Sequence, residues 1–253
     1  MDIATIGGLV LGLSAIIISY ALEGGHLASV FRLPAVLIVL GGTIGASTVT
    51  TSFSTVMSIP TYLRIALFGR QHNPLTTIMR IVKMAERARR EGILGLESEL
   101  ATIDQPFFKK AIQLVIDGTE ITVLKGILET EIAFIEERHR KGIELFRKMG
   151  GFAPTMGIIG TVLGLIHTLA NTDDASRMAA GIATAFIATL WGVATANLIY
   201  LPISDKLKMR NDEEMSNLEL VLEGAMSIQC GDNPRVIRTK LMSFLKPDAR
   251  PKE

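Results

Sequence analysis

Apolar and polar residues follow one another along this chain in long blocks. Four blocks, at about residues 3–22, 33–52, 152–170 and 178–203, are almost wholly apolar. Each is long enough to cross a hydrocarbon layer about 30 Å thick at about 1.5 Å per helical residue. The pattern therefore predicts an all-α, polytopic membrane protein with four transmembrane helices.

The third and fourth blocks are joined by a short polar link, residues 171–177, which predicts a tight helical hairpin. Small residues recur four positions apart in both blocks, at Gly160 and Gly164 and at Ala188 and Gly192. Helices in lipid associate through close packing, and rows of small residues mark the packed faces. These four residues are therefore expected to lie where the helices touch.

Hydroxyl groups are the main polar feature of the predicted hairpin. Thr161 and Thr189 either bond back to their own helix backbone or line a path for water and ions. The two blocks contain no aspartate or glutamate, and His167 lies near the outer end. Because ion transfer across a membrane normally uses an ionisable group at depth, any ion path here needs a carboxylate from another chain.

Basic residues predict how the chain is oriented and how its domains are arranged. Residues 53–151 carry 15 of the 26 lysines and arginines and residues 204–253 carry 9. Since cytoplasmic segments are enriched in basic residues, both termini are expected in the cytoplasm. Residues 1–52 and 152–203 then form the two pairs of spans, residues 53–151 a helical cytoplasmic domain, and residues 204–253 a helical cytoplasmic tail.

The cytoplasmic segments show helical periodicity. It predicts a helix over 75–90, another starting at Gln105-Pro106, and a long one from about Ile121 that continues into the third span. In the tail it predicts a helix over about 204–229 and a shorter one starting at Asn233-Pro234. The charged run 86–91, followed by Glu97 and Glu99, is either a solvated helix face or a surface that docks a partner.

Composition excludes several function classes. The chain is 48% apolar and 20% charged, and its formal charge is +1, without the basic face of a nucleic-acid binder. Its single cysteine, Cys230, cannot form an internal disulfide. We find no phosphate-binding loop, nucleophile elbow or paired metal-ligand spacing, so we expect no catalytic site, cofactor or resident metal.

Several stretches resemble the MotA/PomA family of bacterial flagellar stator A subunits, and more distantly ExbB and TolQ. The likeness covers essentially the full chain and rests on residues 89–97, 104–118, 153–165 and 188–192. Two spans before the large cytoplasmic segment favour the stator type, since ExbB and TolQ look like three-span proteins.

The resemblance implies a multi-pass protein of the bacterial inner membrane, surrounded by lipid. Five A subunits would form a ring around a dimer of a MotB/PomB-type B subunit, whose aspartate binds the transported H⁺ or Na⁺, and the ring would push the rotor protein FliG. By motif, Arg89 and Glu97 match rotor-contacting charges, and Thr161 and Thr189 match hydroxyls beside the ion path. Pro154 and Pro202 match prolines flanking the two inner helices, where a missing N–H permits bending.

Alternative functions stay open at this stage. One is an ExbB/TolQ-like proton-channel subunit that energises transport across the cell envelope, and another is a passive membrane scaffold. The coupling ion is also open, because Thr161 leans towards sodium whereas a hydroxyl also orders water for protons.

Overall fold

The computed structural model describes residues 3–69, 73–170 and 174–251, and within these ranges it is helical, without β-strands. The chain divides into two compact units. The first combines Met1–Arg70 with His139–Arg210, and the second combines Gln71–Arg138 with Asn211–Glu253. Residues 1 and 2 at the start of the predicted first domain, and residues 171–173 of the predicted hairpin link, lie outside the described residues.

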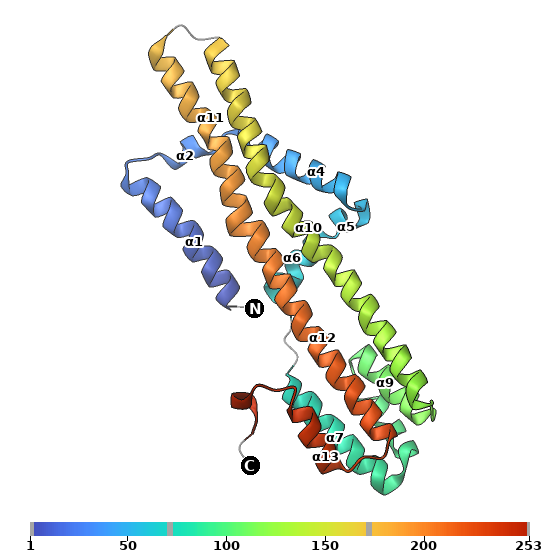
Figure 1. The fold of residues 1–253 in the computed structure, drawn as a ribbon. Helices are drawn as coiled ribbons and strands as arrows, with labels where there is room; N and C mark the ends of the chain where they lie inside the picture. Colours follow the sequence, from blue (N-terminus) through green and yellow to red (C-terminus); the bar gives the residue numbers. More distant parts are fainter. Residues whose placement is uncertain (1–2, 70–72, 171–173, 252–253) are drawn as a thin grey trace. The chain divides into compact units, whose positions relative to one another are not determined.

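The order of elements in the described chain agrees with the predicted all-α class (Figure 1). The elements up to residue 68 are α1 (Ile3–Leu22), α2 (Leu27–Val30), α3 (Leu33–Val36), the π-helix η1 (Leu37–Gly41), α4 (Gly42–Thr50), α5 (Phe53–Met57) and α6 (Ile59–Phe68). The segment predicted to be cytoplasmic contains α7 (Pro74–Glu91), the 3₁₀ turn η2 (Ile93–Leu96), α8 (Glu97–Leu100) and α9 (Pro106–Ile116). Then follow α10 (Ile121–Ala170), α11 (Ala175–Thr195), the π-helix η3 (Ala196–Tyr200), α12 (Leu201–Gln229), α13 (Pro234–Met242) and the 3₁₀ turn η4 (Pro247–Ala249).

Four helices of the described chain are long and apolar enough to span a membrane. They are Thr5–Leu22, Leu33–Thr50, a segment of α10, and a segment of the continuous helix Ala175–Gln229. The prediction of four spanning helices is confirmed on length and composition. So is the prediction that the third span is continuous with the preceding cytoplasmic helix, because α10 is one helix of 50 residues.

Local geometry differs from the predicted elements in the second and fourth spans. The second span is not a uniform α-helix, because the π-turn η1 separates α3 from α4. The fourth spanning helix begins at Ala175 rather than at 178, because the Asp174 carboxylate caps it by accepting the backbone N–H of Ser176 at 2.8 Å. Its hydrogen bonds to the Ser176 hydroxyl and backbone lower the pKa of Asp174.

The core of the first unit is formed by α6 packed against α10 and α12. Tyr62 of α6 covers Gly142 of α10, where an added Cβ would lie 2.7 Å from the ring. Ser204 of α12 donates its hydroxyl to the Ile143 carbonyl at 2.9 Å. The buried residues of this core are Ala66, Leu145, Phe146, Met149, Ala153, Ala196, Tyr200, Ile203 and Leu207.

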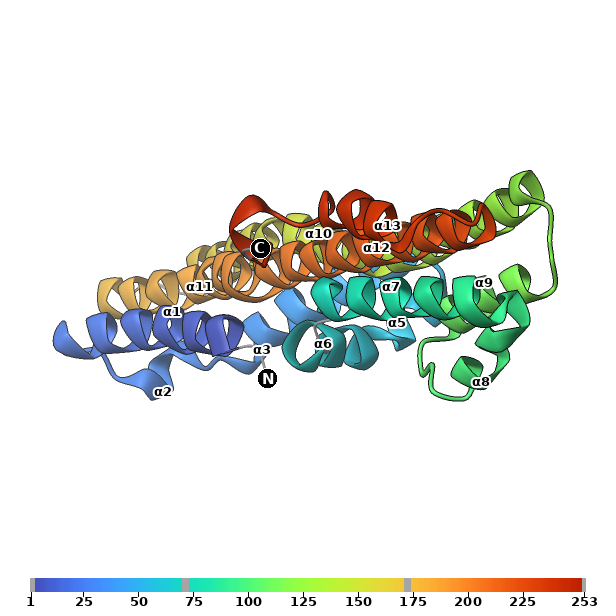
Figure 2. The same cartoon turned by 90° about the horizontal axis from the view of Figure 1, so that it is seen from below.

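The second unit has its own larger core. Figure 2 shows α7 and α13 side by side, and the buried residues come from these two helices, α9, and the parts of α10 and α12 that belong to this unit. Thr77 donates its hydroxyl to the Asn217 side-chain oxygen at 3.1 Å. The predicted apolar face of α7 is buried, with Ile78 and Ile81 fully enclosed. Gly92 follows the end of α7, and Gly118 follows the end of α9. Both glycines have positive φ angles, which glycine adopts without strain.

Candidate functional site

The backbones of α10 and α11 approach each other closely in the first unit. A Cβ added at Gly192 would lie 2.6 Å from the Ala153 carbonyl oxygen, and one added at Gly157 would lie 2.8 Å from the Ala188 oxygen. Only glycine fits at either position without moving a backbone. The two helices are therefore held together by a contact that tolerates no larger side chain.

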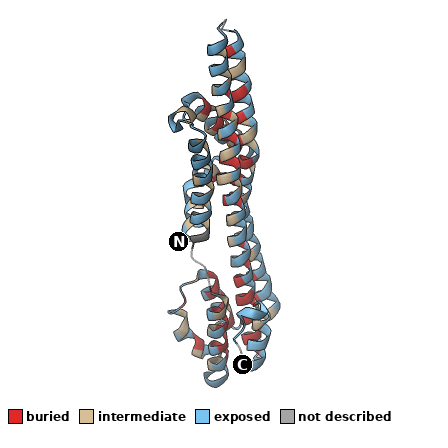
Figure 3. Ribbon diagram, turned by 90° about the vertical axis from the view of Figure 1, so that its left-hand side faces the viewer, coloured by how far each residue is buried: buried red, intermediate tan, exposed pale blue. Residues whose placement is uncertain are grey.

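The small residues predicted to pack do lie on this seam. An added Cβ at Gly160 would meet the Ala188 Cβ at 2.7 Å, and one at Gly164 would meet the Ala185 Cβ at 2.8 Å. Gly192 is buried at the lower end of the same seam. Away from it, much of the hairpin surface is exposed within this single chain (Figure 3).

Thr161 and Thr189 meet at the centre of this seam. Their hydroxyl oxygens are 2.6 Å apart. Thr161 is buried, and its oxygen also lies 3.0 Å from the Ala185 carbonyl and 3.1 Å from the Gly157 carbonyl. Thr161 therefore bonds back to its own helix, which is the first interpretation made from the sequence, and its oxygen also contacts the facing helix. The ion path stays a prediction.

The direction of these hydrogen bonds follows from counting protons. Thr161 carries one hydroxyl proton, and its two carbonyl neighbours can only accept. It therefore donates to a carbonyl, and Thr189 donates to the Thr161 oxygen. The partly exposed Thr189 oxygen keeps lone pairs for a water or a cation. The pair supplies oxygen ligands but no group that titrates near neutral pH.

The two prolines occupy different settings in the first unit. Pro154 lies inside the continuous helix α10, where its Cα would be 3.2 Å from a Cβ added at Gly192. Pro202 is exposed and lies in the first turn of α12, two residues after the π-helix η3 ends at Tyr200. A proline removes one helical N–H and crowds the preceding turn, and the wider π-turn accommodates that change.

Arg89 and Glu97 belong to the second unit, and both are exposed. Arg89 lies near the end of α7 beside a cavity of about 110 Å³. Glu97 begins α8, and the exposed Leu94 lies in the turn between them. Neither charge has an ion-pair partner among the described residues of this chain, so both are available to an external partner.

Arg87, which the sequence did not single out, has a different role. Its guanidinium bonds Glu91 of the same helix at 2.8 Å and Glu99 of α8 at 2.9 Å, and the second contact fastens the end of α7 to α8. These carboxylates, Glu91 first, raise the pKa of Arg87. The charged run thus contains an internal clamp at Arg87, which neither alternative from the sequence included, and an exposed charge at Arg89. Whether the exposed face is only solvated or docks a partner stays a prediction.

Trp191 is a second residue whose role the sequence did not reveal. Its indole N–H donates to the Val30 carbonyl at 2.9 Å, and its ring meets Phe31 edge-on at 5.3 Å. It thus fixes the link between the first two spans to α11. No cluster of three or more His, Cys, Asp or Glu side chains suited to a metal ion occurs within the described ranges.

Comparison with family profiles matches both halves of the chain. The MotA/TolQ/ExbB proton channel family matches residues 99–220. The motility protein A N-terminal family matches residues 6–92.

Individual relatives are similar over nearly the whole length. Motility protein A of Borreliella burgdorferi is 37% identical over 99% of this chain and 96% of its own length. Chemotaxis protein PomA of Vibrio alginolyticus is 36% identical over 99% of this chain and 98% of its own length. Among solved structures, C. jejuni MotAB aligns with a TM-score of 0.93 at 32% identity, covering 98% of this chain and 97% of that one. The flagellar MotAB stator complex of Bacillus subtilis aligns with a TM-score of 0.91 at 30% identity, covering 96% of each.

Proposed function

The chain belongs to the MotA/TolQ/ExbB proton channel family, and from this membership we propose that it is the A-type stator subunit of a bacterial flagellar motor. In this role it couples ion flow to torque. The observation that carries the proposal is the Thr161–Thr189 hydroxyl pair, which lies between two apolar spans, 152–170 and 178–203, that contain no carboxylate. A pair of oxygen ligands that lacks an ionisable group suits one side of an ion path whose other side comes from a second chain.

A B subunit is the proposed partner. The matched C. jejuni and B. subtilis structures are MotAB complexes, which supports a two-component assembly. The B subunit would supply the ion-binding aspartate, and two B subunits would lie inside a ring of five A subunits. The exposed apolar surface of the hairpin is consistent with burial against such neighbours.

The proposed location is the bacterial inner membrane, with both termini in the cytoplasm. The four apolar helices support a multi-pass protein. The orientation rests on the basic residues, since segments 53–151 and 204–253 carry 24 of the 26 lysines and arginines, 15 in the first and 9 in the second.

The proposed rotor-binding residues are Arg89 and Glu97, which would meet charges of opposite sign on FliG. Their exposure supports this assignment, and the neighbouring Leu94 adds an apolar contact. Complementary charges of this kind mainly set association rate and register.

Pro154 and Pro202 are proposed as the bending points of the inner helices. One unit charge crossing 100 mV provides only about 2.3 kcal/mol. Rotation would therefore proceed in many small steps, which suits helices that flex at fixed points. We propose H⁺ or Na⁺ as the transported ion, with no cofactor and no catalytic activity of the chain's own.

The match of residues 6–92 to the motility protein A N-terminal family favours the stator over an ExbB/TolQ-like transport energiser. The test is to express the chain with its B subunit in cells that lack their own A subunit. Swimming speed is measured against external sodium at fixed pH, with and without a protonophore. Restored swimming supports the proposal, and its sodium or protonophore sensitivity identifies the ion. A membrane-inserted, B-bound chain that restores no rotation would contradict the proposal.

A further inference from the structure

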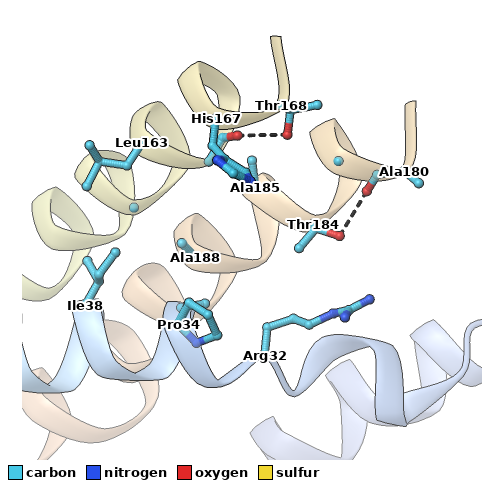
Figure 4. A pocket seen from close by; sticks show the side chains of 14 residues that line it. Arg32, Pro34, Ile38, Leu163, His167, Thr168, Ala180, Thr184, Ala185 and Ala188 are labelled. Carbon is cyan, nitrogen blue, oxygen red and sulfur yellow. Dashed lines mark hydrogen bonds between the residues drawn. The ribbon is translucent and has the colours of Figure 1, made fainter. Parts of the chain in front are cut away.

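A cavity of about 550 Å³ opens in the first unit between the start of the second span and the α10–α11 hairpin (Figure 4). This volume is in the range of ligand pockets, about 300–1,000 Å³. Arg32 and α3 line one side of the cavity. His167 of α10 and Thr184 of α11 line the sides formed by the hairpin. The cavity is separate from the Thr161–Thr189 pair, neither of which lines it.

The position of Arg32 places the mouth of the cavity at the membrane boundary. Arg32 directly precedes Leu33, where the second span begins, and Tyr20, near the end of α1, hydrogen-bonds Ser29 at 2.9 Å. Tyrosine favours the level of the lipid headgroups. Arg32 therefore lies at the outer end of the first two spans in the proposed orientation.

The hairpin extends past this level. In Figure 1 the ends of α10 and α11 project beyond α2. The hairpin thus forms a wall above Arg32, and a molecule at the boundary can enter the cavity from the lipid side.

The charge of the cavity favours an anion. Arg32 is exposed and its guanidinium makes no ion pair or hydrogen bond within the described part of the chain. His167 is the other basic side chain of the lining, and no carboxylate is among the lining residues. A guanidinium binds phosphate oxygens in a two-pronged geometry and keeps its charge at all relevant pH values.

The deeper part of the cavity is apolar. Ile38 and Leu163 line it together with the small residues of the seam. From Thr168 to Gly160, which both line it, α10 descends about 12 Å. A free phosphate would use only the mouth of such a site, whereas a phospholipid would fill both parts.

We propose that this cavity binds an anionic phospholipid, with the phosphate at Arg32 and the upper part of an acyl chain against Ile38 and Leu163. Basic pockets between membrane helices are suited to anionic headgroups. The proposal rests on the chain spanning a membrane and not on its role in a motor.

The test uses the complex of the full chain with its B subunit, stripped of lipid in detergent. Phosphatidylglycerol or phosphatidylcholine is added, and the bound lipid is counted by native mass spectrometry. We expect preferential retention of phosphatidylglycerol. Glycerophosphate, which has the headgroup chemistry without the chains, should not displace it.

Two variants locate the site. Arg32→Gln should weaken phosphatidylglycerol binding at least about tenfold, the loss expected for one charge-assisted contact. Arg177→Gln is the matched control, because Arg177 is also a predicted outer arginine but does not line the cavity. Ala180→Leu, at an exposed lining position, should lower binding by filling the space while leaving all charges in place.

Equal retention of the two lipids, or equal weakening by the two arginine changes, would overturn the proposal. A protein occupant would also overturn it. This is checked by cross-linking from a cysteine at position 180 (Ala180→Cys with Cys230→Ser) in lipid-containing membranes. Efficient cross-linking to the B subunit or to a second copy of the chain would show that protein, not lipid, fills the cavity.

Discussion

The Thr189 hydroxyl lies 2.6 Å from the Thr161 hydroxyl and directs its proton towards it, across the seam between α10 and α11. Thr161 also contacts the Ala185 carbonyl, which lies four residues before Thr189 in α11. A threonine hydroxyl often bonds the carbonyl at that position of its own helix. The two hydroxyls thus form a contact between the helices, instead of each bonding only the backbone of its own helix.

Thr189→Val should reduce ion flux without preventing assembly. Valine keeps the shape of the side chain but leaves the Thr161 oxygen without its donor, a loss of about 1 kcal/mol, or roughly five- to tenfold in rate. Swimming speed and assembly with the B subunit are the measurements. Thr184→Val is the control, since that hydroxyl bonds the Ala180 carbonyl of its own helix. Unchanged swimming in Thr189→Val would remove Thr189 from the ion path.

Gly192→Ala should destabilise the hairpin by about 1–3 kcal/mol, because the new methyl group would meet the Ala153 carbonyl at 2.6 Å. Gly151→Ala, with nothing within 4 Å of the added carbon, should be neutral or stabilising by up to about 1 kcal/mol. Thermal unfolding in detergent compares the two variants. Equal stability of both would show that the seam is looser than described.

Charge reversal at Arg89 or Glu97 should weaken motility without unfolding the chain, because both side chains are exposed. Opposite reversals on the rotor protein should restore part of the motility. Lys83→Glu is the control, because it makes the same charge change at another exposed position of α7. If Lys83→Glu weakened motility as much as Arg89→Glu, the cause would be general electrostatics instead of a specific contact.

Arg87→Ala should act differently from these reversals. It removes the ion pair with Glu99 that joins α8 to α7 and the ion pair with Glu91 within α7, so the second unit should unfold at a lower temperature and no rotor change should rescue motility. Circular dichroism during heating separates this structural effect from a loss of docking. Rescue by a rotor variant would place Arg87 in the docking surface.

The stability contribution of Asp174 should depend on pH. Its pKa in the folded chain is below the ordinary value of 3.8, so its capping of α11 is fully present above that value and is lost as pH falls through the lowered pKa. Asp174→Asn retains an acceptor that does not titrate. The difference in unfolding temperature between the two proteins should therefore shrink or reverse below about pH 4. A difference that is constant from pH 3 to 7 would contradict the capping role.

The sequence predicts much of this fold because most helices have local signals. Asn233 caps α13 as predicted, accepting the backbone N–H of Arg235 at 3.0 Å. Apolar spacing places Ile78 and Ile81 in the core, and four-residue spacing places Gly160 and Ala188 on the packed seam.

Features that depend on partners distant in sequence could not be predicted in this way. The second unit is formed from two segments, 71–138 and 211–253, and contacts such as Thr77 with Asn217 leave no local pattern. The same holds for the Trp191 contact with Val30. The charges near Arg87 look alike in sequence, and only the position of Glu99 distinguishes the clamp from the exposed surface.

The central claim is that a second chain supplies the acidic group of the ion path. Its most direct test is cation flux into liposomes containing this chain alone, the chain with its B subunit, or the chain with a B subunit whose membrane aspartate is replaced by asparagine. We predict flux only for the second preparation. Selective cation flux through the chain alone would contradict the account.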